Sequence, residues 1–341
     1  MKYDICVVGA GIAGSSVAYN LASDFDVCLI EERGLDEVGR KPCPGAVERS
    51  WFERFSPEDF GAVSRCIKSM RLSVGDRSLR VKFDGYVINR HRLCEGLLEA
   101  AFAEGCEWVR GRAKPSFKDG ISYVRAGKRR IESEIYVDAS GSSAVLRRRY
   151  LPNRRNMFLL GCMETIDGGD EGDELSIYLL NHRETSWIFP AEHSTNIGYV
   201  TVGARGLDFD GRLRSFKKDV GLGGARVLER GFGLIPSYKP VRLVNDNVVA
   251  IGDAGFTVNP ITCGGIGPSI STADLFAESL KGGKSLDDFE AKYWEILGKT
   301  HNKFYHLNRV LREGWIPLWW AVRAYYSDNL LCKLIRRLLR V

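Results

Sequence analysis

Gly9-Ala10-Gly11-Ile12-Ala13-Gly14 is the stretch that decides the fold of this chain. It has the spacing GxGxxG, follows the apolar run Tyr3–Val8, and opens a helical stretch over Ile12–Ala22. In such a strand–turn–helix the first glycine permits a tight turn, the second lets the backbone approach a diphosphate, and the third lets helix and strand pack closely. The helix N-terminus adds unpaired N–H groups and a positive dipole end. We therefore predict a dinucleotide-binding βαβ unit at this point.

An acidic residue at the end of the next strand supports this prediction. The apolar run Val27–Ile30 ends in Glu31, where a carboxylate can accept a hydrogen bond from a ribose hydroxyl. A second glycine-rich run, Gly221–Gly224, follows a helical stretch instead of a strand, so we interpret it as a loop and expect no second unit for a nicotinamide. The predicted cofactor contacts in the first unit are Gly9, Gly11, Ala13, Gly14, Glu31 and Glu32.

Three further segments narrow the choice among dinucleotide cofactors. Val137-Asp138-Ala139-Ser140-Gly141 and Ile251-Gly252-Asp253-Ala254 each follow a predicted strand, and Arg90 opens a predicted helix. With these segments in this order, the chain resembles the flavoproteins that include aromatic hydroxylases, flavin halogenases and geranylgeranyl reductases. In that group the Gly-Asp element contacts the ribityl and diphosphate part of FAD. A carboxylate there can accept a hydrogen bond from a ribityl hydroxyl. The resemblance implies FAD, with contacts from Arg90, Ala139, Gly141, Gly252 and Asp253.

Three other motifs point to one family in this group. Asn259–Ile266 resembles the NPxxGGGI stretch of geranylgeranyl reductases, Lys41–Gly45 resembles their PCGG-type loop beside the flavin, and Ser186–Pro190 resembles their YxWxFP motif at the isoprenoid site. Pro44 and Cys263 each replace a glycine of the family, and Thr185 replaces a tyrosine. The resemblance implies flavin contacts from Cys43, Gly45, Gly264, Gly265 and Ile266, and substrate contacts from Trp187, Phe189, Pro190 and Cys263.

The family resemblance also implies a reaction. Geranylgeranyl reductases use FAD to reduce carbon–carbon double bonds of geranylgeranyl chains, in membrane lipids or their precursors. Such an alkene is not polarised, so hydride and proton must be delivered to opposite carbons in a positioned, apolar site. We predict Cys43 as the catalytic residue, and we expect an external electron donor, either NAD(P)H or a ferredoxin-like protein.

The order of the motifs predicts the architecture. We expect an α/β (α+β) protein in which a Rossmann-like FAD-binding domain, formed by residues 1–150 and 245–285, carries an inserted substrate domain with an antiparallel sheet over residues 151–244. Residues 286–341 are expected to form a helical C-terminal region. Within the inserted part, apolar runs at 157–164, 175–180, 186–189 and 196–202 are typical of strands separated by turns.

Composition limits the class of protein. Of 341 residues, 44% are hydrophobic and 27% are charged, as in ordinary globular domains. The nine cysteines show neither a CxxC pair nor a regular spacing, which argues against a disulfide framework or a metal site. They favour a reducing compartment, and we expect a cytoplasmic protein. No apolar run is long enough to span a bilayer.

The C-terminus carries most of the net charge of +6: seven basic and two acidic residues lie between positions 309 and 341. Leucines and isoleucine from 330 to 339 recur at helical spacing, basic residues at 333, 336, 337 and 340 form a second stripe, and aromatic residues lie just upstream. A basic amphipathic helix of this kind suits an anionic membrane surface better than nucleic acid. The alternative is a helix packed on its own domain, with its arginines in water.

Two other functions compete with the reductase. A flavin-dependent monooxygenase or halogenase would share the fold, although the segment around Trp187 has one tryptophan where halogenases have a WxWxIP pair. A prenyl-binding protein without redox activity also resembles this fold. The phosphate loop together with Glu31 and Asp253 argues against that third possibility.

Overall fold

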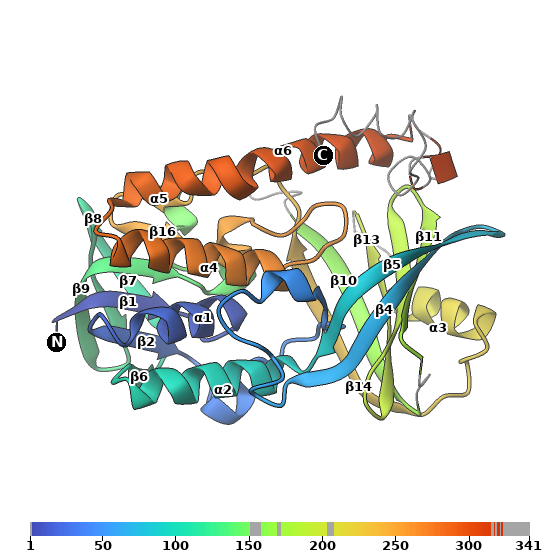
Figure 1. Cartoon of the computed structure of the whole chain (residues 1–341), viewed down its shortest axis with the longest axis horizontal. Helices are drawn as coiled ribbons and strands as arrows, with labels where there is room; N and C mark the ends of the chain where they lie inside the picture. The colour runs from blue at the N-terminus through green and yellow to red at the C-terminus, as the bar shows by residue number, and fades with distance from the viewer. Residues whose placement is uncertain are drawn as a thin grey trace.

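The computed structural model describes residues 2–150, 158–168, 172–202 and 208–314, together with positions 317, 319, 320 and 322. Two sheets form the body of the molecule, and helices cover one face of the first (Figure 1). Sheet one runs β15-β16-β9-β1-β2-β6, with β7 and β8 attached to β9. Its strands are β1 (Lys2–Val8), β2 (Val27–Glu31), β6 (Glu107–Arg110), β7 (Ala113–Lys118), β8 (Gly120–Ala126), β9 (Arg129–Asp138), β15 (Val244–Asn245) and β16 (Val248–Ala250).

Five strands of sheet one, β16, β9, β1, β2 and β6, run parallel, so their carboxyl ends lie at the same edge. β1 pairs with β2 and with β9, and β9 pairs with β16, all in parallel register. The glycine-rich turn, Glu31, the loop after Asp138 and the Gly252-Asp253 element therefore all follow carboxyl ends of neighbouring strands. Ligands of open parallel sheets bind at this edge. Sheet pairing thus brings together motifs that lie far apart in the sequence.

The two faces of β1 explain its nearly continuous apolar sequence. Ile5 and Val7 pack beneath the helices α1 (Ile12–Leu21), α2 (Arg90–Ala103) and α4 (Ile266–Lys281). Cys6 and Val8 pack on the other face, against residues of β8 and β9. A strand buried on both faces reads as an apolar run without alternation. Helix α1 lies between α2 and α4 and is buried almost all round.

Sheet two has the order β14-β10-β13-β12-β11-β4-β5-β3, and among its described strands only β11 and β4 pair in parallel. Its strands are β3 (Ala46–Glu48), β4 (Val63–Val74), β5 (Arg77–Ile88), β10 (Phe158–Asp167), β11 (Glu174–Asn181), β12 (Glu184–Pro190), β13 (Ser194–Thr201) and β14 (Val227–Pro236). The strands predicted between residues 157 and 202 are all present in it. The predicted domain boundaries stay a prediction, but β3, β4 and β5 join sheet two although they lie within residues 1–150.

Alternation along the strands gives sheet two a covered face and an open face. Cys162 and Tyr199 pack against helix α3 (Phe209–Asp219) on one face. Leu159 of β10 and Val200 of β13 lie on the opposite face, which looks toward sheet one. Because successive side chains of a strand point to opposite faces, one sequence of β10 serves both surfaces.

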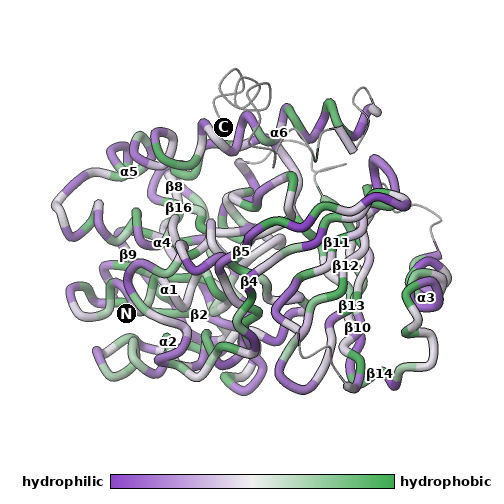
Figure 2. Tube along the Cα trace, turned by 45° about the vertical axis from the view of Figure 1, so that its right-hand side comes forward, coloured by the Kyte–Doolittle hydropathy of each residue, from purple (hydrophilic) through white to green (hydrophobic). Residues whose placement is uncertain are grey.

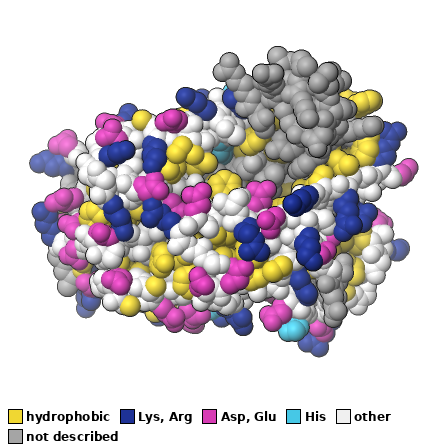
Figure 3. Space-filling model, in the orientation of Figure 1, with side chains coloured by type: hydrophobic (Ala, Val, Ile, Leu, Met, Phe, Trp, Pro, Cys, Tyr) yellow, Lys and Arg dark blue, Asp and Glu magenta, His cyan; other side chains and the backbone are white. Residues whose placement is uncertain are grey.

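Three helical segments after α4 complete the described chain: α5 (Leu286–Tyr293), a π-helical turn (Trp294–Gly298) and α6 (Lys299–Arg312). In Figure 1 α6 lies along the top of the molecule and reaches sheet two, and hydrophilic and hydrophobic residues alternate along it in Figure 2. Among the described residues on the face drawn in Figure 3, basic and acidic side chains are interspersed. The predicted basic helix near the C-terminus lies outside the described residues.

Within the described ranges, no helix combines the length and the apolar composition that crossing a bilayer requires.

Candidate functional site

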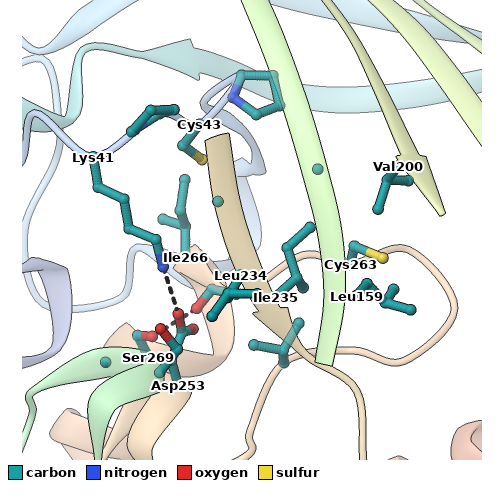
Figure 4. A pocket seen from close by; sticks show the side chains of 18 of the residues that line it. Lys41, Cys43, Leu159, Val200, Leu234, Ile235, Asp253, Cys263, Ile266 and Ser269 are labelled. Carbon is teal, nitrogen blue, oxygen red and sulfur yellow. Dashed lines mark hydrogen bonds and ion pairs between the residues drawn. The ribbon is translucent and has the colours of Figure 1, made fainter. Parts of the chain in front are cut away.

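A cavity of about 1300 Å³ lies between the carboxyl edge of sheet one and the open face of sheet two. Ordinary small-ligand pockets measure about 300–1,000 Å³, so this cavity has room for more than one small ligand. Glycine-rich turns of sheet one line one end of it, and apolar side chains of sheet two line the other. Figure 4 shows the part between these ends.

The three glycines of the phosphate loop, Gly9, Gly11 and Gly14, are required for different steric reasons. Gly9 has a positive φ of 100°, and a Cβ there would lie 2.5 Å from the carbonyl oxygen of Ala139. A Cβ on Gly14 would lie 1.7 Å from the carbonyl oxygen of Gly9, so this glycine permits close packing of helix and strand. A Cβ on Gly11 would meet no atom within 4 Å, and Gly11 lines the cavity. Gly11 therefore leaves open the space that a diphosphate needs beside the N-terminus of α1.

Glu31 is held in place at the end of β2. Its Oε2 accepts a hydrogen bond from the backbone N–H of Ala10 at 2.9 Å, and its Oε1 accepts one from the backbone N–H of Arg33 at 3.1 Å. Each carboxylate oxygen can accept a further hydrogen bond. Glu31 and Glu32 both line the cavity, so a ribose hydroxyl can reach this carboxylate.

The loop after β9 is organised by the buried Asp138. One carboxylate oxygen accepts hydrogen bonds from the backbone N–H groups of Leu146 and Arg147, and the other accepts them from the N–H and hydroxyl of Ser140. This arrangement turns Ala139 and Gly141 toward the cavity. Gly141 has a positive φ of 66° and, like Gly11, open space where a Cβ would sit.

Arg90 adds a positive charge at the same end. Its Nη1 donates a hydrogen bond to the carbonyl oxygen of Lys41 at 3.1 Å. Its Nε is buried and has no hydrogen-bond partner among the described residues, although Arg90 lines the cavity. A buried guanidinium N–H without a partner is costly, and an anionic ligand would relieve that cost.

An ion pair crosses this part of the cavity. Lys41 Nζ lies 3.0 Å from Asp253 Oδ2, as the dashed line in Figure 4 marks. Asp253 comes from the short helix Gly252–Gly255 after β16, whereas Lys41 begins the loop of the Cys43 motif. Pro42 in turn packs over Gly231 of β14, where a Cβ would lie 2.0 Å from the proline Cγ. The Lys41–Gly45 loop is therefore docked on both sheets.

Lys41 is a site residue that the sequence analysis missed. The available signal was a lysine at the head of a motif already expected beside the flavin.

Cys43 and Cys263 both line the cavity, from separate elements. Figure 4 shows them apart, with Leu234 and Ile235 between them in that view. Cys263 occupies a left-handed backbone position with φ 58°, which glycine adopts more easily. Desolvation raises the pKa of its thiol to about 11, although the Arg312 guanidinium opposes this shift, so Cys263 is a neutral thiol at physiological pH.

Trp187 and Phe189 project from β12 into the cavity. Trp187 lies opposite Gly198 on β13, and a Cβ on Gly198 would lie 2.0 Å from Cζ2 of the indole. The glycine thus provides the seat for this ring. Apolar residues of β10, β13, β14 and α6 complete what we call the chamber: Leu159, Val200, Leu234, Ile235, Phe304, Leu307 and Leu311.

The chamber residues beyond β12 escaped the sequence analysis. Their signals were strand alternation and, on α6, the helical spacing of 304, 307, 308, 311 and 312.

Most of the predicted site residues meet at this cavity: Gly9, Gly11, Ala13, Glu31, Glu32, Cys43, Arg90, Ala139, Gly141, Trp187, Phe189, Asp253, Cys263, Gly265 and Ile266. Five others do not line it, namely Gly14, Gly45, Pro190, Gly252 and Gly264. Gly45 and Gly252 have positive φ angles, of 79° and 68°, and shape the backbone beside the cavity. Direct ligand contact remains a prediction for all of these residues.

We expect Gly198→Ala to destabilise the protein through Trp187. Because the new methyl group would overlap the indole, the ring must move, and such overpacking costs about 1–3 kcal/mol of the free energy of unfolding. Gly161→Ala on β10 is the control, since its nearest neighbours would lie 3.7 Å away. Chemical denaturation followed by tryptophan fluorescence measures both. Equal stability of the two variants would show that Gly198 does not seat the ring.

Comparisons with known proteins find relatives that are named as reductases of prenyl lipids. No protein-family model matches the chain. It is 27% identical to the digeranylgeranylglycerophospholipid reductase of Sulfolobus acidocaldarius, over 87% of this chain and 73% of that protein. It is 26% identical to digeranylgeranylglycerophospholipid reductase 1 of Methanopyrus kandleri, over 86% of this chain and 84% of that protein.

Solved structures show the same fold. A geranylgeranyl bacteriochlorophyll reductase-like protein from Thermoplasma acidophilum superposes with a TM-score of 0.79 at 18% identity, covering 91% of this chain and 88% of that one. A flavin-dependent brominase gives a TM-score of 0.80 at 17% identity, covering 99% and 93%. These findings confirm the predicted fold class and the predicted resemblance to geranylgeranyl reductases.

Proposed function

We propose that this protein is an FAD-dependent reductase that hydrogenates carbon–carbon double bonds of geranylgeranyl chains in membrane lipids or their precursors. The observation that carries the proposal is one continuous cavity that joins a glycine-lined cradle for a diphosphate to an apolar chamber. The two curated relatives are named as reductases of a digeranylgeranyl lipid, which supports the same reading.

The residues at the carboxyl edge of sheet one fit FAD. Gly11 and Gly141 leave open the space beside the backbone, and Arg90 offers a buried N–H without a partner among the described residues. Glu31 and Asp253 present carboxylates for ribose and ribityl hydroxyls. Bound FAD, once reduced, supplies the hydride that an unpolarised alkene requires.

The chain itself positions the alkene, excludes water from the chamber and supplies a proton. Trp187, Phe189 and the chamber residues exclude water and hold the alkene, and the faces of the two rings can stabilise positive charge that develops on carbon. Helix α4 begins at Ile266, and its N-cap Gly265 lines the cavity without a capping side chain. The positive end of its dipole then favours negative charge nearby. We assign proton delivery or positioning of the alkene to Cys43.

A flavin-dependent monooxygenase or halogenase is the second candidate, because the brominase shares the fold over nearly the whole chain. Both candidates begin from reduced flavin, and they differ in what oxidises it. The purified flavoprotein is reduced without oxygen and then mixed with a geranylgeranyl lipid. Flavin reoxidation with formation of the saturated chain supports the reductase, whereas product formation that requires oxygen supports the second candidate. Running the reduction with NADPH, NADH or reduced ferredoxin also identifies the donor.

We further propose that the protein is cytoplasmic and binds the membrane peripherally through its C-terminal sequence. A geranylgeranyl lipid resides in a bilayer, and each Lys or Arg near an anionic surface contributes about 1 kcal/mol to binding. Truncation after Tyr326 removes the basic residues Lys333, Arg336, Arg337 and Arg340. We expect the truncated protein to sediment less with anionic liposomes at low salt while it keeps its flavin. A full-length protein that ignores such liposomes would refute membrane binding.

A further inference from the structure

The cavity also has a polar corner, which adjoins the apolar chamber. It lies where the turn between β11 and β12 meets the C-terminal end of α6, on the side of sheet two that α6 reaches in Figure 1. His182 and Arg183 line it from the turn, and Arg312 lines it from the last residue of α6. No motif of the sequence pointed to these three residues, and the cofactor end of the cavity does not include them.

Arg183 belongs to the cavity face of its hairpin. It comes just before β12, two and four residues before Thr185 and Trp187, which also line the cavity. The adjacent Glu184 engages other groups instead: its Oε2 accepts a hydrogen bond from Asn181 Nδ2 at 2.6 Å and lies 3.8 Å from Arg212 Nη1. Among the described residues, no carboxylate forms an ion pair with Arg183.

Arg312 is held beside this site without a countercharge. Its Nη2 donates a hydrogen bond to the hydroxyl of Ser237 at 3.1 Å, and no described carboxylate pairs with it. Burial lowers the pKa of Arg312, and the nearby Arg183 guanidinium lowers it further. Arg309, one turn earlier on the same helix, instead pairs with Glu313 at 3.2 Å and does not line the cavity.

His182 adds a third nitrogen group. Its Nδ1 is buried and has no hydrogen-bond partner among the described residues. Two like charges beside each other repel, and an unpartnered buried nitrogen is costly. A ligand with several anionic oxygens would offset the repulsion between the two arginines and accept a hydrogen bond from His182 in the form that carries a proton on Nδ1. Arginine forks match phosphate in particular.

We propose that Arg183, Arg312 and His182 bind the phosphate of a phosphorylated prenyl lipid, whose chain extends through the chamber toward Trp187 and the flavin. This inference rests on the proposed function and adds the residues that hold the headgroup of the substrate. The protein then takes its substrate after the step that attaches phosphate to the prenyl chain or its glycerol, and it discriminates against the free prenyl alcohol.

Calorimetric binding to the oxidised, flavin-loaded protein tests this site without turnover. The probes are geranylgeranyl diphosphate, a digeranylgeranyl glycerophospholipid in detergent, and geranylgeraniol. We expect Arg183→Gln and Arg312→Gln each to weaken binding of at least one phosphorylated probe about 10- to 100-fold, and to leave geranylgeraniol unchanged. Arg309→Gln, with the same charge change on the same helix, should bind all probes as the unaltered protein does.

The probes that lose affinity in each variant decide the result of the experiment. The phosphorylated probe that loses affinity identifies the headgroup, either a diphosphate or a glycerophospholipid. Arg312→Lys keeps the charge without the fork, so we expect a smaller loss than with Arg312→Gln. If Arg183→Gln, at an exposed turn, binds both phosphorylated probes normally, or loses geranylgeraniol equally, the site is refuted. Selective loss of phosphorylated probes by a protein that reduces none of them would refute the reductase and leave the anion site standing.

Discussion

Replacing Gly11 by valine is expected to give a folded protein that binds no flavin. Gly11 has φ −66° and ψ −173°, an extended conformation that valine adopts readily. Its Cβ would touch no protein atom and would project into the cavity. The side chain therefore leaves the fold intact and occupies the place proposed for the diphosphate. The molar ratio of flavin to protein, measured by flavin absorbance, should be near one in the unaltered protein and near zero in the purified variant.

The control for this variant is Gly224→Val. Gly224 lies in the exposed turn between α3 and β14, also has open space at its Cβ, and does not line the cavity. We expect that protein to stay yellow. Thermal unfolding of both variants separates loss of flavin from loss of fold. A Gly11→Val protein that holds stoichiometric FAD would contradict the placement of the phosphate loop.

Cys43→Ser is expected to keep the flavin and to lose about 100-fold or more of the rate of alkene reduction. Cys43 lines the cavity from a loop that the Lys41–Asp253 ion pair and the Pro42–Gly231 contact hold in place. A serine preserves that loop, but its hydroxyl is a weaker acid than a thiol. Removing a general acid typically slows a reaction 10²- to 10⁴-fold. The rate is measured as anaerobic reoxidation of the reduced flavin by a geranylgeranyl lipid.

Cys66→Ser controls for loss of a thiol as such. Cys66 is exposed on β4 and does not line the cavity, so its replacement should leave the rate unchanged. If Cys43→Ser turns over as fast as the Cys66→Ser protein with flavin bound, Cys43 has no part in the reaction, and the neutral thiol of Cys263 becomes the next thiol to test.

Motifs that follow a strand end could be read from the sequence because their chemistry is local. GxGxxG needs its glycines within one turn, where Gly9 has a positive φ and Gly14 touches the backbone of Gly9. The strands within residues 158–201 could also be predicted from the sequence, because turn residues separate their apolar runs. The hairpin β4–β5 was not: its residues are mostly half-exposed or exposed, so it lacks the apolar run of a buried strand.

The sequence by itself therefore determined the phosphate loop, its strand–helix context, the positions of the strand-end motifs and the resemblance to a family. These features depend on backbone conformation and side-chain type within a few residues. Only the tertiary structure decided which side chains share one cavity. Parallel pairing brought Asp138 beside Val8, the ion pair with Asp253 placed Lys41, and the approach of α6 to sheet two brought Arg312 to Arg183. Contacts between residues more than a hundred positions apart depend on how whole elements pack, and no local pattern encodes them.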